Sequence, residues 1–300
     1  MLDLRRLNVL RTVAREGSFS AAARKLAYTQ PAVSHHIQRL EAELGTPLLI
    51  RTPSGASLTE AGEALVGYAE RALAQLAMAE EEVAMIAGLR AGRVRVAAFP
   101  SASSTLIPAA ARALKADHPR LTLSLTEVEP PEAIALLRAG EVDIAVTFSY
   151  PEMGPSNGDP FHLKPLLRDE VKVLLPGITD PAPVALATLS EATWIAGCER
   201  CRAHLLQLAQ QAGFTPEIAF ATDDPVTVQA LVAAGLGVAL LPSLALSQSR
   251  RTDITVAPLT PVSEREITAL VASGGRQPPA VAAMLERLQG AAADLTPVLA

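Results

Sequence analysis

The chain has 300 residues, of which 49% are hydrophobic and 19% charged, and its formal net charge is −5. This composition is typical of a soluble globular protein with ample core and two or three domains. Two cysteines are too few for a disulfide framework, no signal-peptide pattern opens the chain, and no uninterrupted run of about 18 apolar residues exists, so we expect a cytoplasmic protein without a membrane segment.

Charge is distributed unevenly over the first third of the chain. Residues 1–55 hold eight Lys or Arg against four Asp or Glu, whereas residues 58–90 hold two Arg against six Glu. A small basic segment followed by an acidic helix is what a DNA-reading module on a stalk would show.

The first 45 residues predict three helices. An apolar residue at every third position predicts a helix over residues 3–15. Ser18 is a good N-cap for a second helix. Thr29 caps a third, which carries Pro31 in its first turn and ends at Gly45.

The third helix has two distinct faces. One face is apolar and should belong to the core, with Val33, Ile37, Leu40 and Leu44. The opposite face is short and polar, with Pro31, Ser34, His35 and Gln38. Such a face suits insertion into the DNA major groove. Periodicity alone is equally compatible with an ordinary amphipathic surface helix.

A hairpin is expected next. Leu48–Ile50 form a short apolar strand, a turn containing Pro and Gly follows, and a second strand ends near Leu58. Arg51 stands at the edge of this hairpin "wing", where it can contact a phosphate.

A long helix is predicted from Thr59 to about Gly88, with a capping box formed by Ser57 and Glu60. Both apolar positions of a heptad repeat are filled over four heptads, by Gly62, Ala69, Leu76 and Val83 and, offset by three, by Leu58, Leu65, Ala72, Ala79 and Ile86. A dimerising stalk of roughly 45 Å is favoured over a helix packed along its own core, because the stripe is narrow and its flanks are charged.

From about residue 93 onward, strands and helices alternate. Strands are expected at 94–99, 121–128, 142–148, 166–176, 194–197, 217–222, 237–242 and 266–272, and helices at 104–117, 132–139, 202–212, 225–234 and 279–292. Such alternation predicts mostly parallel sheets covered by helices in two similar lobes. Ligands in such folds bind at the carboxyl ends of the strands, here between the lobes.

Two stretches are characteristic of a known family. They are GSFSAAARKL, TQPAVSHHIQRLEAELG, LLIRT and LTEAG within residues 17–62, and LVAAGLGVALLP at 231–242. The chain resembles the LysR-type transcriptional regulators along its full length. The resemblance implies a multidomain α/β protein with a winged helix-turn-helix over 1–58, a linker and dimerisation helix over 59–89, and a two-lobed α/β effector domain similar to periplasmic binding proteins over 90–300 (one lobe about 93–162 plus 268–300, the other about 163–267).

The resemblance also implies partners. These are double-stranded DNA with an interrupted inverted-repeat operator, a small-molecule effector, RNA polymerase, and further copies of the chain in a homodimer or homotetramer. No cofactor, metal or membrane is expected.

For DNA, the resemblance implies contacts from the start of the third helix. Gln30 can pair with adenine, Ser34 can accept or donate at a base edge, Pro31 can pack on a thymine methyl, and Thr29 lies near a phosphate. The remaining candidate DNA-binding residues are His35, Gln38, Arg39 and Arg51.

The sequence departs from the family pattern at three places. His35 and His36 replace the common Arg and Gln or Leu, the strand 48–51 lacks the usual aromatic and acid, and Ser54 replaces a wing Arg. Fewer phosphate contacts predict a shallower salt dependence of DNA binding.

For the effector, the segment 100–105 follows the first strand of the second part. Hydroxyl and N–H groups at a helix N-terminus bind carboxylates or phosphates well, although a plain Ser-rich N-cap has the same sequence. The resemblance makes this segment part of the effector pocket, so an anionic effector is expected. Its candidate contacts are Ser101, Ser103, Thr147, Phe148, Gly197, Cys198, Arg202 and Asp223.

The C-x-x-C pair Cys198 and Cys201 is the one unusual chemical feature. At a helix start and beside Arg200, a thiolate can form, close a disulfide or bind a soft metal; the pair can equally be two packed side chains. A thiol-, redox- or metal-responsive regulator of the same family is therefore the alternative.

Two other classes fit less well. A solute-binding protein would leave residues 1–90 without a role. No phosphate-binding glycine loop, nucleophile elbow or His-x-x-x-His helix is present, so an enzyme is not expected.

Overall fold

The structure is a computed structural model that describes residues 2–52, 55–86, 92–151, 161–273 and 277–299. The chain divides into two units, the first comprising residues 1–90 together with 135–142 and the second comprising the remainder. No helix in the described ranges combines the length and the apolar character needed to cross a bilayer.

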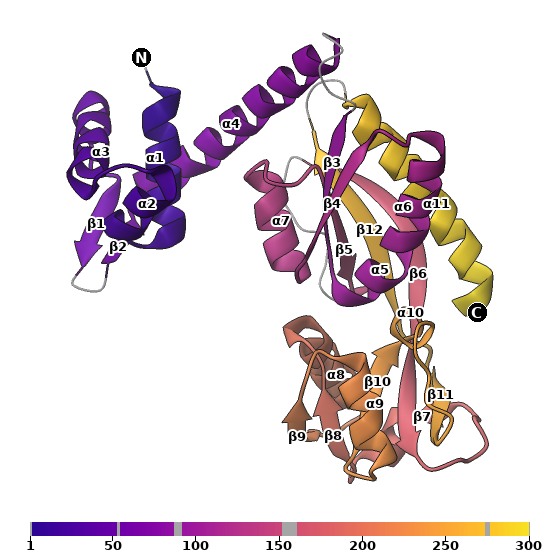
Figure 1. The fold of residues 1–300 in the computed structure, drawn as a ribbon. Helices are drawn as coiled ribbons and strands as arrows, with labels where there is room; N and C mark the ends of the chain where they lie inside the picture. Colours follow the sequence, from indigo (N-terminus) through magenta and orange to yellow (C-terminus); the bar gives the residue numbers. More distant parts are fainter. Residues whose placement is uncertain (1, 53–54, 87–91, 152–160, 274–276, 300) are drawn as a thin grey trace. The chain divides into compact units, whose positions relative to one another are not determined.

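The N-terminal unit contains three short helices, a hairpin and a long helix. They are α1 (Leu4–Glu16), α2 (Phe19–Leu26), α3 (Gln30–Leu44), β1 (Leu49–Thr52), β2 (Gly55–Leu58) and α4 (Glu60–Ile86) (Figure 1). The winged helix-turn-helix and the long helix expected from the sequence are confirmed.

The ends of α2 and α3 follow the expected local chemistry. The Ser18 hydroxyl accepts the N–H of Ala21, and the Thr29 hydroxyl accepts the N–H of Ala32, each at 3.4 Å. Gly45 ends α3 with φ of +68°, a left-handed conformation that glycine adopts without a Cβ clash. These caps fix where α3 begins and therefore which of its residues face outward.

The core face of α3 is as predicted except at its end. Val33, Ile37 and Leu40 are buried, but Leu44 is 40% exposed, so the expectation that it belongs to the core is wrong. The carboxylate of Glu41 accepts the N–H of Leu48, which turns the chain back toward the helix. Leu48 is fully buried in the core of this unit beyond the end of α3.

The wing is an antiparallel hairpin in which Leu49 pairs with Leu58 and Arg51 with Ala56. Its first strand runs two residues further than predicted, through Thr52. Ser54, where the family often has an Arg, lies outside the described residues.

The cap of α4 differs from the predicted capping box. Ser57 is a strand residue paired with Ile50, and the Thr59 hydroxyl instead accepts the N–H of Gly62 at 3.0 Å. Since a hairpin strand and an N-cap need different surroundings, the pairing of β2 excludes Ser57 from the capping role.

The second part of the chain, residues 91–300, alternates strands and helices as expected, and within it residues 135–142 belong to the N-terminal unit. Its elements are β3 (Arg93–Ala98), α5 (Pro100–Ser104), α6 (Leu106–Asp117), β4 (Thr122–Glu127), α7 (Pro130–Arg138), β5 (Ile144–Ser149), β6 (Phe161–Pro176), β7 (Val184–Ala185), η2 (Leu186–Leu189), β8 (Thr193–Ala196), α8 (Glu199–Gln211), β9 (Glu217–Ala221), α9 (Pro225–Ala233), β10 (Val238–Pro242), α10 (Ser243–Leu246), β11 (Ile254–Thr260), β12 (Glu264–Ala272) and α11 (Pro279–Leu299).

Two lobes share the 16-residue strand β6, which continues from one to the other (Figure 1). The strand order is β4-β3-β5-β12-β6-β10-β8-β9, with β11 and β7 beyond β6. Each lobe has three parallel strands, β4-β3-β5 and β10-β8-β9. The sheets are mixed rather than mostly parallel, because β6 runs antiparallel to β10, β11 and β12, and β12 antiparallel to β5.

Several elements of the second part were not expected. The predicted helix at 104–117 is two helices, and the first already begins at Pro100. The short elements β7 and α10 and the strand β11 were missed. All three pack on β6 or β11, so their conformation depends on neighbours that are distant in sequence.

Candidate DNA-binding surface and ligand pockets

The polar face of α3 is open to solvent. Its candidate DNA-binding residues Thr29, Gln30, Pro31, His35, Gln38 and Arg39 are exposed, and Ser34 is half-buried. Because Thr29 is the N-cap, Gln30 and Pro31 occupy the first turn, where side chains of a recognition helix contact base edges. Arg51 lies on β1 in the wing.

His36 is placed differently from His35. Its ring stacks on Tyr28 with centroids 5.7 Å apart, whereas His35 is exposed. His36 is therefore a packed side chain, whereas His35 lies on the polar face of α3.

A small cavity of about 60 Å³, here called the cleft pocket, lies between the two lobes. Its wall brings together five of the eight candidate effector contacts. The lining residues are Phe99, Pro100, Ser101, Glu129, Phe148, Gly197, Cys198, Cys201, Thr222, Asp223, Pro225, Leu240, Leu241, Pro242, Ala245 and Arg265. A cavity of this size holds about two water molecules, so a larger ligand requires the lobes to separate.

Arg265 dominates the cleft pocket electrostatically. Its side chain is 3% exposed, its Nε donates to Asp169 at 2.9 Å, and its Nη2 donates to the Ser101 hydroxyl at 2.8 Å. The guanidinium carbon lies 4.9 Å from the ring centroid of Phe99 and 4.7 Å from that of Phe148. Burial acts against its charge, but the Asp169 carboxylate together with the neighbouring Tyr150 and Cys201 outweighs this effect, so the pKa of Arg265 is raised.

Glu129 and Asp223 are acidic side chains in the wall of the cleft pocket, and Glu129 is half-buried. Burial raises the pKa of its carboxyl, opposed by a hydrogen bond with Cys198. Its buried Oε2 has no hydrogen-bond partner among the described residues. A buried carboxylate oxygen without a donor costs free energy, so this atom is a natural partner for a donor on a bound molecule.

The two cysteines lie in contact at the start of α8. The Cys198 thiol donates to the Cys201 Sγ at 3.1 Å, and the Tyr150 hydroxyl donates to the same sulfur at 3.6 Å. The hydrogen bond from Cys198, together with the charge of Arg265, lowers the pKa of Cys201 to about 7. The same hydrogen bond and burial raise the pKa of Cys198. The pair thus consists of one thiolate-forming sulfur and one protonated donor.

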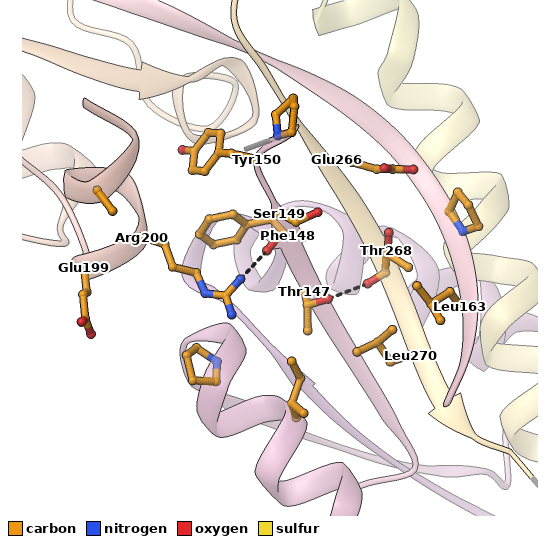
Figure 2. A pocket seen from close by; sticks show the side chains of 15 residues that line it. Thr147, Phe148, Ser149, Tyr150, Leu163, Glu199, Arg200, Glu266, Thr268 and Leu270 are labelled. Atoms are coloured by element: carbon orange, nitrogen blue, oxygen red, sulfur yellow. Dashed lines mark hydrogen bonds between the residues drawn. The ribbon is translucent and has the colours of Figure 1, made fainter. Parts of the chain in front are cut away.

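A larger cavity of about 780 Å³, here called the hinge pocket, lies beside β5, β6 and β12 (Figure 2). It is lined by Pro131, Ile134, Thr147, Phe148, Ser149, Tyr150, Pro151, Leu163, Pro165, Glu199, Arg200, Ala203, Glu266, Thr268 and Leu270. Its volume falls in the range of small-molecule sites.

The candidate effector contacts therefore do not form one cluster. Ser101, Gly197, Cys198 and Asp223 line the cleft pocket, Thr147 lines the hinge pocket, and Phe148 lines both. Ser103 is buried, donates to the Ala98 carbonyl at 3.1 Å, and lines neither pocket; exposed Arg202 also lines neither.

Sequence reasoning missed the residues with the strongest electrostatic roles. Strand alternation could have found Arg265, because Ser263, Arg265 and Ile267 occupy the buried positions of SEREI while Glu264 and Glu266 point outward. A buried Arg in such a pattern predicts an acidic partner. No signal in the sequence identifies that partner as Asp169, which lies on another strand.

Taken together, the geometry defines a winged helix-turn-helix protein whose second part is a two-lobed ligand-binding type of domain. Residues 4–63 match the bacterial regulatory helix-turn-helix proteins of the lysR family, and residues 87–293 match the LysR substrate binding domain. The chain belongs to the LysR family and is a DNA-binding transcriptional regulator.

Two relatives are similar over most of the chain. The probable HTH-type transcriptional regulator LrrA of Synechococcus elongatus is 31% identical over 297 residues, covering 98% of this chain and 99% of that protein. The HTH-type transcriptional regulator ShiR of Corynebacterium glutamicum is 32% identical over 248 residues, covering 80% and 82%.

Solved structures share the fold. A full-length OxyR variant from Pseudomonas aeruginosa superposes with a TM-score of 0.68 at 24% identity, covering 96% of this chain and 95% of that chain. Full-length CbnR complexed with its target DNA gives a TM-score of 0.59 at 24% identity, covering 97% and 100%.

Proposed function

We propose that this regulator binds an interrupted inverted-repeat operator in the cytoplasm and that a small-molecule effector in the cleft pocket switches operator binding or contact with RNA polymerase. The proposed division of labour assigns DNA binding to 1–58, dimerisation to 59–89 and effector binding to 90–300. No catalytic step is assigned to it.

One observation carries the effector proposal. The Arg265 guanidinium packs against the rings of Phe99 and Phe148 in the wall of the cleft pocket, and the described residues give its Nη1 no hydrogen-bond acceptor. An anionic group on the effector would accept hydrogen bonds from the remaining N–H donors of this guanidinium, since Arg binds carboxylates through parallel N–H donors. Glu129 adds a requirement for a hydrogen-bond donor elsewhere on the same effector.

The N-terminus of α5 offers an anion fewer backbone N–H donors than the sequence suggests. The N–H groups of Ala102 and Ser103 both donate to the carbonyl of Phe99, at 3.0 and 2.9 Å. The contribution of this segment is therefore the Ser101 hydroxyl, held by Arg265, rather than a row of backbone donors.

Self-association through α4 is supported by the exposure of its heptad stripe. Val66 and Ala69 pack in the core of the N-terminal unit, but Leu76 is 43% and Val83 65% exposed. Exposed apolar side chains at heptad spacing suit a partner helix. We propose a homodimer through this stripe and a homotetramer on DNA.

The test uses the intact chain and the fragment 91–300. Operator binding by the intact chain, lost in the fragment, supports the DNA-binding assignment; failure of the intact chain to discriminate its upstream DNA from random DNA contradicts it. Native mass spectrometry of the fragment should show a bound small anion that disappears in Ser101→Leu, which fills the cleft pocket. Retention of the same mass in Ser101→Leu contradicts the cleft as the site.

The cysteine pair favours a second candidate, a thiol-responsive regulator. The Cys201 thiolate would attack a peroxide, forming a sulfur–oxygen bond as the O–O bond breaks, and the Cys198 sulfur would then displace water to form a disulfide. The two thiols lose two electrons and the peroxide becomes two waters. The sulfurs need to approach by about 1 Å from their present separation of 3.1 Å. Loss of peroxide-induced transcription in Cys201→Ser supports this candidate, whereas unchanged induction removes it.

A further inference from the structure

The wall of the cleft pocket carries more negative than positive charge. Among the described residues that line it, Arg265 is the one cation, and its charge is already paired with Asp169 at 2.8 Å. Glu129 and Asp223 remain as two further carboxylates in the wall, and neither forms an ion pair within the described ranges. A ligand that carries a positive group is therefore attracted to this pocket, whereas one with negative charge alone meets two carboxylates.

Glu129 lacks both a hydrogen-bond donor and a compensating charge. Its buried Oε2 has no partner among the described residues. Burial raises the pKa of Glu129, and the charge of Asp223 adds to this rise. A hydrogen bond with Cys198 and the charges of two arginines lower the pKa without cancelling the rise. An ammonium group on a ligand would supply the missing hydrogen bond and the missing charge together.

Arg265 and Ser101 set the opposite requirement in the same pocket. The Nε and Nη2 of Arg265 are used by Asp169 and Ser101, whereas its Nη1 has no acceptor in the described part of the chain. The Ser101 hydroxyl accepts from Arg265, so its own hydrogen remains available as a donor. These two donors suit a carboxylate, which accepts several hydrogen bonds at once.

The size of the cavity limits the distance between the two charges of a ligand. At about 60 Å³ the cleft pocket holds about two water molecules. Since Arg265 and Glu129 both line this small space, groups that meet them inside it are separated by only one or two carbon atoms. An ammonium and a carboxylate at that spacing form the head group of an α- or β-amino acid.

We propose that the cleft effector is a zwitterionic amino acid, whose carboxylate binds Arg265 and Ser101 and whose ammonium binds Glu129 and Asp223. This inference rests on the proposed function, because it names the chemical class of the effector in the same pocket. The carboxylate is the anionic group already proposed, and the ammonium is the added requirement. The head group is common to all amino acids, so the side chain is found by screening.

The screen measures thermal unfolding of the full-length protein with each of the twenty standard L-amino acids and with β-alanine. Each is present at about 10 mM, tenfold above a Kd of about 1 mM, because a ligand that binds the folded state raises Tm. At least one amino acid should raise Tm in the wild-type protein and fail to do so in Ser101→Leu. Stabilisation by none of them, or stabilisation that persists in Ser101→Leu, overturns the proposal.

Calorimetry then tests the head group with two analogues that keep the side chain of the best amino acid. One is the desamino acid, which lacks the ammonium, and the other is the decarboxylated amine. Each should bind at least about tenfold more weakly than the amino acid, the loss expected when hydrogen bonds between charged groups are removed. Equal binding of the desamino acid overturns this inference and leaves an anionic effector in the cleft. Equal binding of the amine overturns the anionic effector as well.

Failure of the inference is distinguishable from failure of the proposed function. If no amino acid binds but native mass spectrometry still shows an anion that is lost in Ser101→Leu, the cleft remains the effector site and the amino-acid class is wrong. If neither experiment shows a ligand, both proposals are contradicted.

Three variants locate the ammonium contact. Glu129→Gln should weaken binding of the amino acid about tenfold, and binding of the desamino acid should be unchanged or tighter, because a charge that repels carboxylates is removed. Asp223→Asn should act in the same direction and less strongly; Asp223 is exposed, so this variant keeps the fold even where Glu129→Gln does not. The matched control is Glu127→Gln, an exposed carboxylate of β4 outside the pocket, which should change neither affinity.

The two ligands together separate an electrostatic role from a structural one. Equal loss of the amino acid and the desamino acid in Glu129→Gln would assign this side chain to the structure of the pocket and contradict the ammonium contact. Amino-acid binding that is unchanged in both Glu129→Gln and Asp223→Asn would contradict it too.

Discussion

The guanidinium of Arg265 and the carboxylate of Asp169 lie 2.8 Å apart, and their side chains are 3% and 0% exposed. Asp169 also accepts the N–H of Leu244 at 2.9 Å. The pair therefore joins β6, β12 and the start of α10 in the region where the lobes meet. The net stabilisation from a buried charge pair is smaller than the destabilisation caused by removing one partner. The reason is that the remaining partner then carries a buried charge without compensation.

We expect Asp169→Asn to destabilise the C-terminal unit by about 3–5 kcal/mol, the cost of leaving a buried charge unpaired. The measurement is urea unfolding followed through Trp194, which is fully buried and is the single tryptophan of the chain. The matched control is Asp253→Asn, which removes the acid of the exposed pair with Arg251 and should leave the transition where it is. Coincident transitions for Asp169→Asn and the wild type would contradict the assigned role.

Cys201 should react with iodoacetamide as a thiolate at neutral pH. Its pKa of about 7 means that it is mostly protonated below pH 7 and that its alkylation rate rises as the pH passes through that value. Cys198→Ser replaces the thiol donor that contributes most to this pKa, and Tyr150→Phe removes a second donor. The rate profile should move to higher pH in both variants, more in Cys198→Ser if the serine hydroxyl fails to reach the sulfur. A Cys201 profile centred above pH 8.5, as for an ordinary thiol, contradicts the proposed thiolate.

Ser34→Ala should weaken binding to the specific operator by about 1–3 kcal/mol while binding to random DNA stays constant, as for loss of a base-edge contact. The hydroxyl is half-buried on α3 and is not part of its apolar core, so the fold should persist. Parallel titrations with operator and random duplexes measure the difference. Equal losses on both duplexes would instead assign Ser34 to phosphate contact.

The exposed half of the α4 stripe should control self-association. Val83→Glu places a charge at a heptad position that is 65% exposed in the single chain, so it should lower dimer affinity without unfolding α4. Gln75→Glu adds the same charge on the same helix outside the stripe and serves as the control. Sedimentation velocity should show monomer in Val83→Glu and dimer or larger in Gln75→Glu. Identical profiles would place the dimer contact elsewhere.

Local chemistry was sufficient to predict the helix boundaries at Ser18, Thr29 and Gly45 in the N-terminal unit. Ser18, Thr29 and Gly45 mark helix boundaries through hydrogen bonds and a backbone angle that involve only nearby residues, and all three were found from the sequence. The error at Leu44 arises because the Glu41 side chain positions the chain that returns to the core at Leu48, which helix periodicity does not reveal. The capping box at Ser57 failed for a similar reason, since strand pairing with Ile50 overrides a local cap.

In the C-terminal unit the alternation of strands and helices could be predicted from the sequence, but the direction of β6 and β12 could not. Strand periodicity gives which residues face one side, and it carries no information about which strand lies next to it. The antiparallel β6 and β12 therefore emerged only from the assembled sheet, and with them the sharing of β6 between the lobes.

What the sequence by itself determined is the family, the order of helices and strands and the polar face of α3, because periodicity and end-capping depend on residues close together in the chain. What only the tertiary structure decided is which side chains meet. Arg265 and Asp169 are 96 residues apart, and Arg200 and Phe148 are 52 apart. Such pairs are created by sheet register and by the packing of α8, so the division of the candidate effector residues between two pockets could be seen only in the folded chain.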